Sequence, residues 1–163
     1  MSIIKFFKKK PEPIVINDAL GSFILEEKYK LYEGKINWLG QDVSVSLHCD
    51  NVDSLTANIT LENLRKIMAK AADWDKKLRQ SAVEDMAGED GMIEIWGDEM
   101  DSDDNIPPIT AEEFLSRISL SFMHIYPNGE IYFDYDLDGM FTDHGLGIYA
   151  DISGENLSPR LMG

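Results

Sequence analysis

The chain has little of what several classes of protein need. Only Cys49 among its 163 residues is a cysteine, so an intramolecular disulfide is excluded and a reducing, cytoplasmic location is expected. No apolar run approaches the roughly 18 residues that span a bilayer. A glycine-rich phosphate loop, a serine or cysteine nucleophile motif and paired zinc ligands are also missing from the sequence. These absences argue against a secreted disulfide-stabilised protein, a transmembrane helix and the common nucleotide-dependent enzymes.

Basic residues are scarce and unevenly spread. The chain has 15 lysines and arginines against 30 aspartates and glutamates, a formal net charge of −15. A nucleic-acid-binding protein normally needs a basic face, so this class is disfavoured. Residues 84–151 contain 18 acidic side chains and a single basic one, Arg117. We interpret the acidic half either as a solubilising surface or as a docking surface for a basic partner.

Size and composition predict a single domain over residues 14–163. The chain is 44% hydrophobic, and a chain of this length can bury a core without disulfides or metal. Residues 1–13 are predicted to be a flexible basic N-terminus, because four lysines are followed by Pro11 and Pro13. This segment lacks the order of a secretory signal and would make at most a weak peripheral membrane contact. An exposed acidic loop is expected at about 97–108.

The hydrophobic periodicity predicts an α+β fold. Two antiparallel three-stranded β segments flank a central helical region, with the helices packed on one face of the sheet. Strands are predicted in the first and last thirds of the chain, at 22–27, 30–38, 43–48, 118–126, 131–137 and 145–153. Apolar residues from Leu61 to Met86 predict one long helix, or two helices broken near 72–73. The capping-box pattern from Thr110 to Glu113 predicts a short helix that ends at about Arg117.

Strand alternation assigns side chains to faces. In the third strand Val43, Val45 and Leu47 are predicted to point inward, and adjacent residues point to opposite faces. By the same reasoning His124 shares a face with Ile118, Leu120 and Phe122 as a core or edge histidine. Four aromatic residues are interpreted as parts of apolar faces: Trp38, Trp74, Phe122 and Tyr149.

The sharpest local pattern is an alternation of three aspartates before a glycine. Asp134, Asp136 and Asp138 match the first half of a calcium-binding loop, in which alternating carboxylates supply oxygen ligands. The twelfth position of such a loop, normally a bidentate glutamate, is Gly145. The simpler interpretation is a strand with its aspartates outward and its apolar residues inward. With Asp143 and His144 nearby, the alternative function is a metal-dependent hydrolase or a calcium-binding module.

Four segments resemble a bacterial domain-of-unknown-function family, number 2262. The segments are residues 21–47, the run Trp74-Asp75-Lys76-Lys77, and residues 109–114 and 133–154. The resemblance covers most of residues 20–154 and implies a small bacterial protein without an assigned reaction. Some members are similar in size and acidity to the immunity proteins that guard cells against polymorphic toxins.

We therefore predict a cytoplasmic binding protein that presents an acidic surface to a basic protein partner. The most concrete form is an immunity-like inhibitor of a nuclease toxin, whose active site is basic because it binds phosphates. No catalytic residue and no cofactor are assigned, and only the alternative function requires Ca²⁺. Trp96 is either an interface anchor or a plug for the core. The candidate partner contacts are Glu94, Trp96, Asp98, Glu99, Asp101, Asp103 and Asp104.

Overall fold

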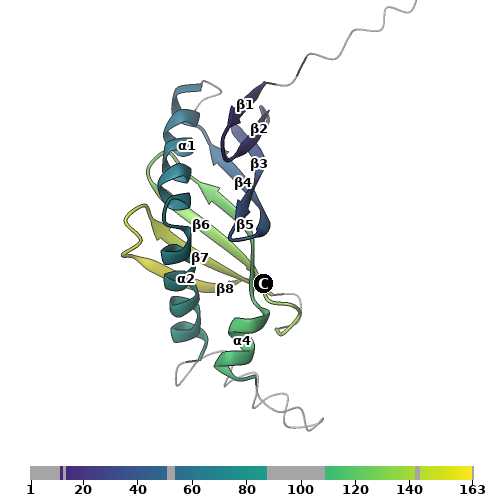
Figure 1. Ribbon diagram of the computed structural model, residues 1–163, viewed down its shortest axis with the longest axis vertical. Helices are drawn as coiled ribbons and strands as arrows, with labels where there is room; N and C mark the ends of the chain where they lie inside the picture. Colours follow the sequence, from purple (N-terminus) through teal and green to yellow (C-terminus); the bar gives the residue numbers. More distant parts are fainter. Residues whose placement is uncertain (1–11, 13, 51–53, 88–108, 142–143, 163) are drawn as a thin grey trace, which may run out of the picture.

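An eight-stranded sheet forms the centre of the molecule (Figure 1). The computed structural model describes residues 12, 14–50, 54–87, 109–141 and 144–162. Neighbouring strands follow the chain order from β1 to β8 and are antiparallel, except for the parallel pair β4–β5. The strands are β1 Val15–Asp18, β2 Gly21–Glu26, β3 Leu31–Trp38, β4 Gln41–His48, β5 Ser119–Ile125, β6 Glu130–Asp136, β7 Gly145–Asp151 and β8 Leu157–Met162.

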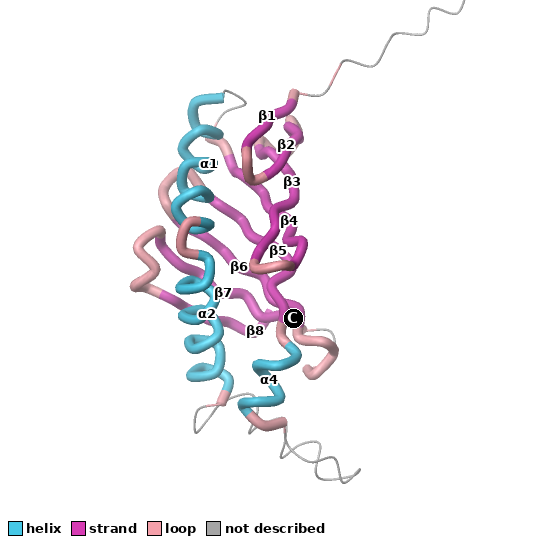
Figure 2. Tube along the Cα trace, in the orientation of Figure 1, coloured by secondary structure: helices cyan, strands magenta, loops and turns pink. Residues whose placement is uncertain are grey.

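Two helices follow one another along one face of the sheet, as Figures 1 and 2 show. Helix α1, Ser54–Met68, packs over β3, β4 and β5, and helix α2, Ala71–Met86, packs over β8. These helices lie in the connection between β4 and β5, and a parallel strand pair needs such a crossover. The short helix α4, Ala111–Arg117, contacts α2 and leads into β5.

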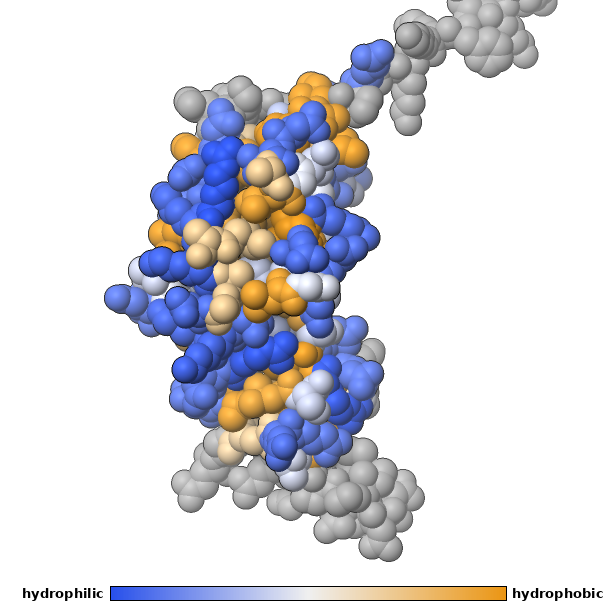
Figure 3. All heavy atoms as spheres, in the orientation of Figure 1, coloured by the Kyte–Doolittle hydropathy of each residue, from blue (hydrophilic) through white to orange (hydrophobic). Residues whose placement is uncertain are grey.

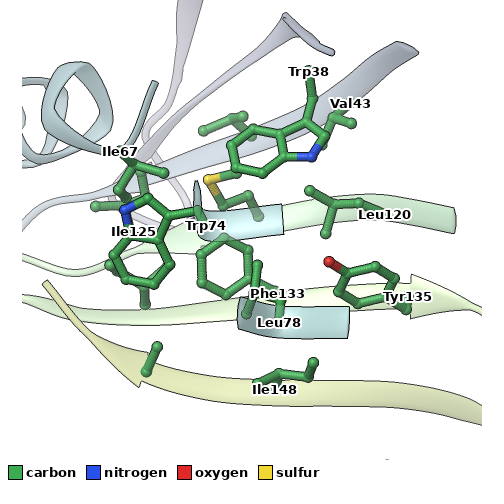
Figure 4. Packing of buried hydrophobic residues seen from close by; sticks show 14 of the residues in the cluster. Trp38, Val43, Ile67, Trp74, Leu78, Leu120, Ile125, Phe133, Tyr135 and Ile148 are labelled. Carbon is green, nitrogen blue, oxygen red and sulfur yellow. The ribbon is translucent and has the colours of Figure 1, made fainter. Parts of the chain in front are cut away.

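The core lies between the sheet and the helices. Trp74 of α2 packs against Phe133 of β6 with 5.6 Å between the ring centroids, among the buried side chains shown in Figure 4. Trp38 of β3 is buried and donates its indole N–H to Asp75 Oδ1 of α2 over 3.3 Å. Figure 3 shows apolar residues gathered between the helices and the strands, with hydrophilic residues on both sides. The helix-facing side chains of the strands are therefore the ones that stabilise the fold by burial.

The α+β class is confirmed, but the predicted three-stranded segments are wrong. Four strands precede the helices and four follow them, because β1 and β8 were not predicted. Strand β1 has only four residues. Strand β8 contains Pro159, which weakens a strand signal but is tolerated at the edge of a sheet, where β8 lies.

Helix packing also differs in detail from the prediction. The break between α1 and α2 lies at residues 69–70, earlier than the expected 72–73. Helix α4 packs against α2 near the start of β5. Its predicted boundaries are confirmed: Thr110 Oγ1 accepts a hydrogen bond from the Glu113 N–H over 3.1 Å, and the helix ends at Arg117. The inward direction of Val43, Val45 and Leu47 is confirmed too, since all three are fully buried.

Other predictions fall on residues that the structure does not describe. The predicted N-terminal segment lies outside the described residues, apart from Glu12, and so does the acidic loop at about 97–108. Among the described helices, none has the length and apolar character that crossing a membrane would require.

Candidate functional site

The face of the sheet opposite α1 and α2 is the candidate site, and we call it the open face. No helix in the described part of the chain covers it. The strand register aligns its side chains in rows that run across the sheet. One row, which we call the central row, crosses every strand and consists of Val15, Ile24, Glu33, Ser46, His124, Tyr132, Tyr149 and Ser158. The adjacent row consists of Lys35, Ser44, Phe122, Asp134, Gly147 and Arg160.

Two histidines lie in contact at the centre of the open face. His48 of β4 and His124 of β5 have their Nε2 and Nδ1 atoms 3.1 Å apart, so one ring donates a hydrogen bond to the other. The Tyr126 ring stacks on His48 at 4.2 Å between centroids, and Phe122 stacks on His124 at 4.5 Å. These four stacked or hydrogen-bonded rings make a continuous aromatic patch over β4 and β5.

Burial keeps both histidines uncharged at neutral pH. It lowers the pKa of His48, and it lowers the pKa of His124 to about 4, with the nearby His48 adding to the effect. A hydrogen bond between two imidazoles needs one N–H donor and one unprotonated acceptor, which a neutral pair supplies. The open face therefore gains no positive charge from its histidines near pH 7.

Two tyrosines extend the aromatic patch across β6 and β7. Tyr132 lies 5.7 Å from His124 and 4.8 Å from Tyr149, measured between ring centroids. Gly147 makes this arrangement possible, because a Cβ atom there would lie 2.5 Å from Tyr132 Cε2. Arg160 of β8 lies over the Tyr149 ring at 5.7 Å. Tyr149 is 45% exposed, so the outer end of the patch is accessible to a partner.

Ser46 is a buried polar residue in the central row. It is 1% exposed, and its Oγ atom has no hydrogen-bond partner among the residues that the structure describes. A buried hydroxyl without a partner costs about 1–3 kcal/mol. Its register neighbours in the row are Glu33 and His124. The open face thus holds a buried hydroxyl beside its histidine pair that finds no partner in the described part of the chain, and such groups are uncommon in native proteins.

Carboxylates surround the aromatic patch. By strand alternation the described strands place two cations on the open face, Lys35 and Arg160. Burial raises the pKa of Asp134, and the neighbouring Asp136 adds to this effect. The acidic residues of the same face are Glu26, Glu33, Asp42, Glu130, Asp134, Asp136 and Asp151. An aromatic centre with a mainly acidic surround suits a basic protein surface.

The three aspartates of the calcium-like pattern make different local contacts. Asp134 and Asp136 belong to the open face, and Asp136 Oδ1 accepts a hydrogen bond from the Asp138 N–H over 2.7 Å. Asp138 Oδ2 pairs with Arg117 Nε at 3.0 Å. His144 Nδ1 lies 3.0 Å from the Phe141 carbonyl oxygen. In the described ranges, which omit Asp143, no three histidine, cysteine or acidic side chains are placed to hold one metal ion.

The predicted partner contacts between 94 and 104 cannot be placed on this face or any other, since they lie outside the described residues. They are Glu94, Trp96, Asp98, Glu99, Asp101, Asp103 and Asp104.

The open face itself was missed by sequence reasoning. The assignment of His124 to the face of Leu120 is wrong, because a β-bulge between Leu120 and Phe122 shifts the alternation. Phe122 is directed to the open face together with His124. Tyr149 is also on the open face, and not on the apolar, helix-facing side of its strand as predicted. The strict apolar alternation of Met123 and Ile125 was the signal that could have placed Phe122 and His124 outward.

A comparison with protein families shows to which family the chain belongs. The sequence model of domain-of-unknown-function family 2262, described as an uncharacterized protein conserved in bacteria, matches residues 17–161. The chain belongs to this family. The match begins within β1, covers β2 to β7 completely and ends one residue before the end of β8, so nearly all of the fold and of the open face lies within the family domain. No curated protein and no solved structure matches this family member significantly.

Proposed function

We propose that this protein is a binding protein whose open face holds a basic protein partner. The observation that carries the proposal is the composition of that face: stacked rings at its centre, and seven carboxylates against two cations around them. Aromatic residues are enriched at the centre of protein interfaces, and complementary charge speeds association. Exposed apolar side chains support the same use, since Ile24 and Met162 are 45% and 42% exposed.

The acidic stretch of the chain also favours a basic partner. Its predicted contacts lie between Glu94 and Asp104, and with the open face they would attract a partner of positive charge. A nuclease has a basic active site because it binds phosphates. An immunity-like inhibitor of such a toxin is therefore the form of this function that the charges favour, in the cytoplasm of a bacterium.

Two charge-reversed variants test the proposal. Glu26→Lys with Asp42→Lys changes two exposed residues of the open face, and Asp85→Lys with Glu112→Lys makes the same charge change on α2 and α4. Tagged wild-type and variant proteins are used to capture partners from the native host at low salt.

The open-face variant should lose a basic partner that the wild type and the helix-side variant both retain. Salt should release this partner, because the Debye length shortens from about 10 Å at 0.1 M to about 3 Å at 1 M. Equal capture by both variants, or a captured partner that is acidic, would contradict the proposal. Circular dichroism of both variants establishes that they are folded.

A further inference from the structure

A shallow hollow in the open face is lined by short and apolar side chains. It lies over β2, β3, β4 and the middle of β5, and its volume is about 530 Å³. Ser22 and Ser44 contribute only short side chains to this face, which explains why the surface is recessed here. Ile24 and Phe122 provide apolar walls, and Glu33 and Lys35 provide the charges. Gly34 and Val45 also line the hollow, although the Val45 side chain is buried in the core on the other side of the sheet.

We propose that this hollow receives an arginine side chain of the partner, an inference that rests on the proposed function. Glu33 is exposed and forms no ion pair with any residue in the described part of the chain, so its carboxylate is free to accept from a guanidinium. An arginine can bond a carboxylate with two parallel N–H groups.

The walls of the hollow favour arginine over lysine. The stacking of Phe122 on His124 holds the Phe122 ring in place at the border of the hollow. A planar guanidinium stacks on such a ring and still directs its N–H groups sideways to acceptors. The Ser22 hydroxyl donates to Asn17 Oδ1 over 2.8 Å, which leaves its oxygen able to accept. A lysine ammonium is a compact point charge, so it has no flat group that could stack on the ring and direct N–H groups sideways.

Lys35 should weaken the binding of an arginine side chain in the hollow. It lines the same hollow, and its register partner is Ser44. Its positive charge opposes the entry of a cation, so removing it should strengthen binding. Glu33 and Lys35 are thus neighbours on one strand whose substitutions should act in opposite directions.

The test uses fluorescently labelled hexa-arginine and hexa-lysine peptides and measures their affinity by fluorescence anisotropy. Wild-type protein should bind hexa-arginine about three- to tenfold more tightly than hexa-lysine. Glu33→Gln should reduce this ratio to near one. Asp42→Asn removes the same charge from the open face outside the hollow, and it should weaken both peptides equally and preserve the ratio. Lys35→Met should increase the affinity for hexa-arginine.

Two outcomes would overturn the inference: a wild-type ratio near one, or a ratio that Glu33→Gln and Asp42→Asn change to the same extent. The thermal unfolding midpoint of each variant establishes that the protein is folded. Neither outcome would affect the proposed function, which depends on capture of the partner by the variants at Glu26 and Asp42. Loss of that capture difference, with the peptide ratio intact, would instead remove the proposed function alone.

Discussion

The histidine pair is the feature of the open face that most depends on individual residues. His48 and His124 are 76 positions apart in the sequence, and only the parallel pairing of β4 with β5 brings them within 3.1 Å. The sequence shows both histidines, but it does not show which strands are neighbours. The β-bulge after Leu120 then decides that His124 points to the same face as His48.

The pair predicts a pH dependence of stability. The pKa of His124 is lowered to about 4 from its usual 6.5, so between these values the unfolded chain binds more protons than the folded one. Stability should therefore fall as the pH decreases from about 6.5 to about 4. Because the ring is partly exposed, the loss should be on the order of 1 kcal/mol. Chemical denaturation at pH 7.5 and pH 5.0 measures it.

The matched variant for this measurement is His124→Phe, which keeps a ring against Phe122 and cannot be protonated. It should lose less stability than the wild type over the same pH change. The raised pKa of Asp134 acts in the opposite direction near pH 4, but it is present in both proteins and cancels in the comparison. An identical loss in both proteins would show that His124 is not the group responsible.

Among the secondary-structure elements, α2 and α4 are joined by one arginine. Arg79 Nε pairs with Asp75 Oδ2 at 2.9 Å on its own helix. Its Nη1 donates to the carbonyl oxygens of Leu115 at 2.9 Å and Ile118 at 3.4 Å, at the end of α4. The charged side chain thus satisfies helix-end carbonyls that have no partner within α4.

Replacing Arg79 by methionine should lower the free energy of unfolding by about 2–3 kcal/mol, since hydrogen bonds to a charged donor are lost. The control is Arg117→Met, which removes an equally charged side chain from α4. Arg117 pairs with the carboxylates of Glu113 and Asp138 and donates to the Asp138 carbonyl oxygen, all at the surface, so its loss should cost less than about 1 kcal/mol. Urea denaturation compares the two variants. Similar costs would show that Arg79 does not join the helices as described.

Elements with a strong periodic pattern could be predicted from the sequence, and weakly patterned ones could not. The strand with Val43, Val45 and Leu47 alternates strictly, and the capping box at Thr110 is a local signal, so both were found. Strand β1 has too few residues to show a period, and β8 carries Pro159. Edge strands are held by pairing with a neighbour, and this tertiary contribution leaves little trace in the sequence.

The whole molecule divides its surface between two roles. The helices cover one face of the sheet and bury the core, and the other face carries histidines, tyrosines and carboxylates where a structural face would need only simple polar residues. The excess of acidic residues was evident from the sequence, but their arrangement around stacked rings depends on the pairing of all eight strands. Composition therefore suggested the charge of a partner, which stays a prediction, and the fold is what locates the candidate site.

Hydroxyl-radical footprinting of the complex with the captured basic partner tests the role of the open face most directly. Tyr149 and Met162 are the probes on this face, at 45% and 42% exposure. Tyr29 and Ile59, at 61% and 44%, are exposed reporters elsewhere, in the β2–β3 turn and on α1. Binding should reduce the oxidation of Tyr149 and Met162 several-fold and leave Tyr29 and Ile59 unchanged. Protection of Tyr29 and Ile59, with Tyr149 and Met162 oxidised as in the free protein, would contradict the assignment of the open face as the partner-binding surface.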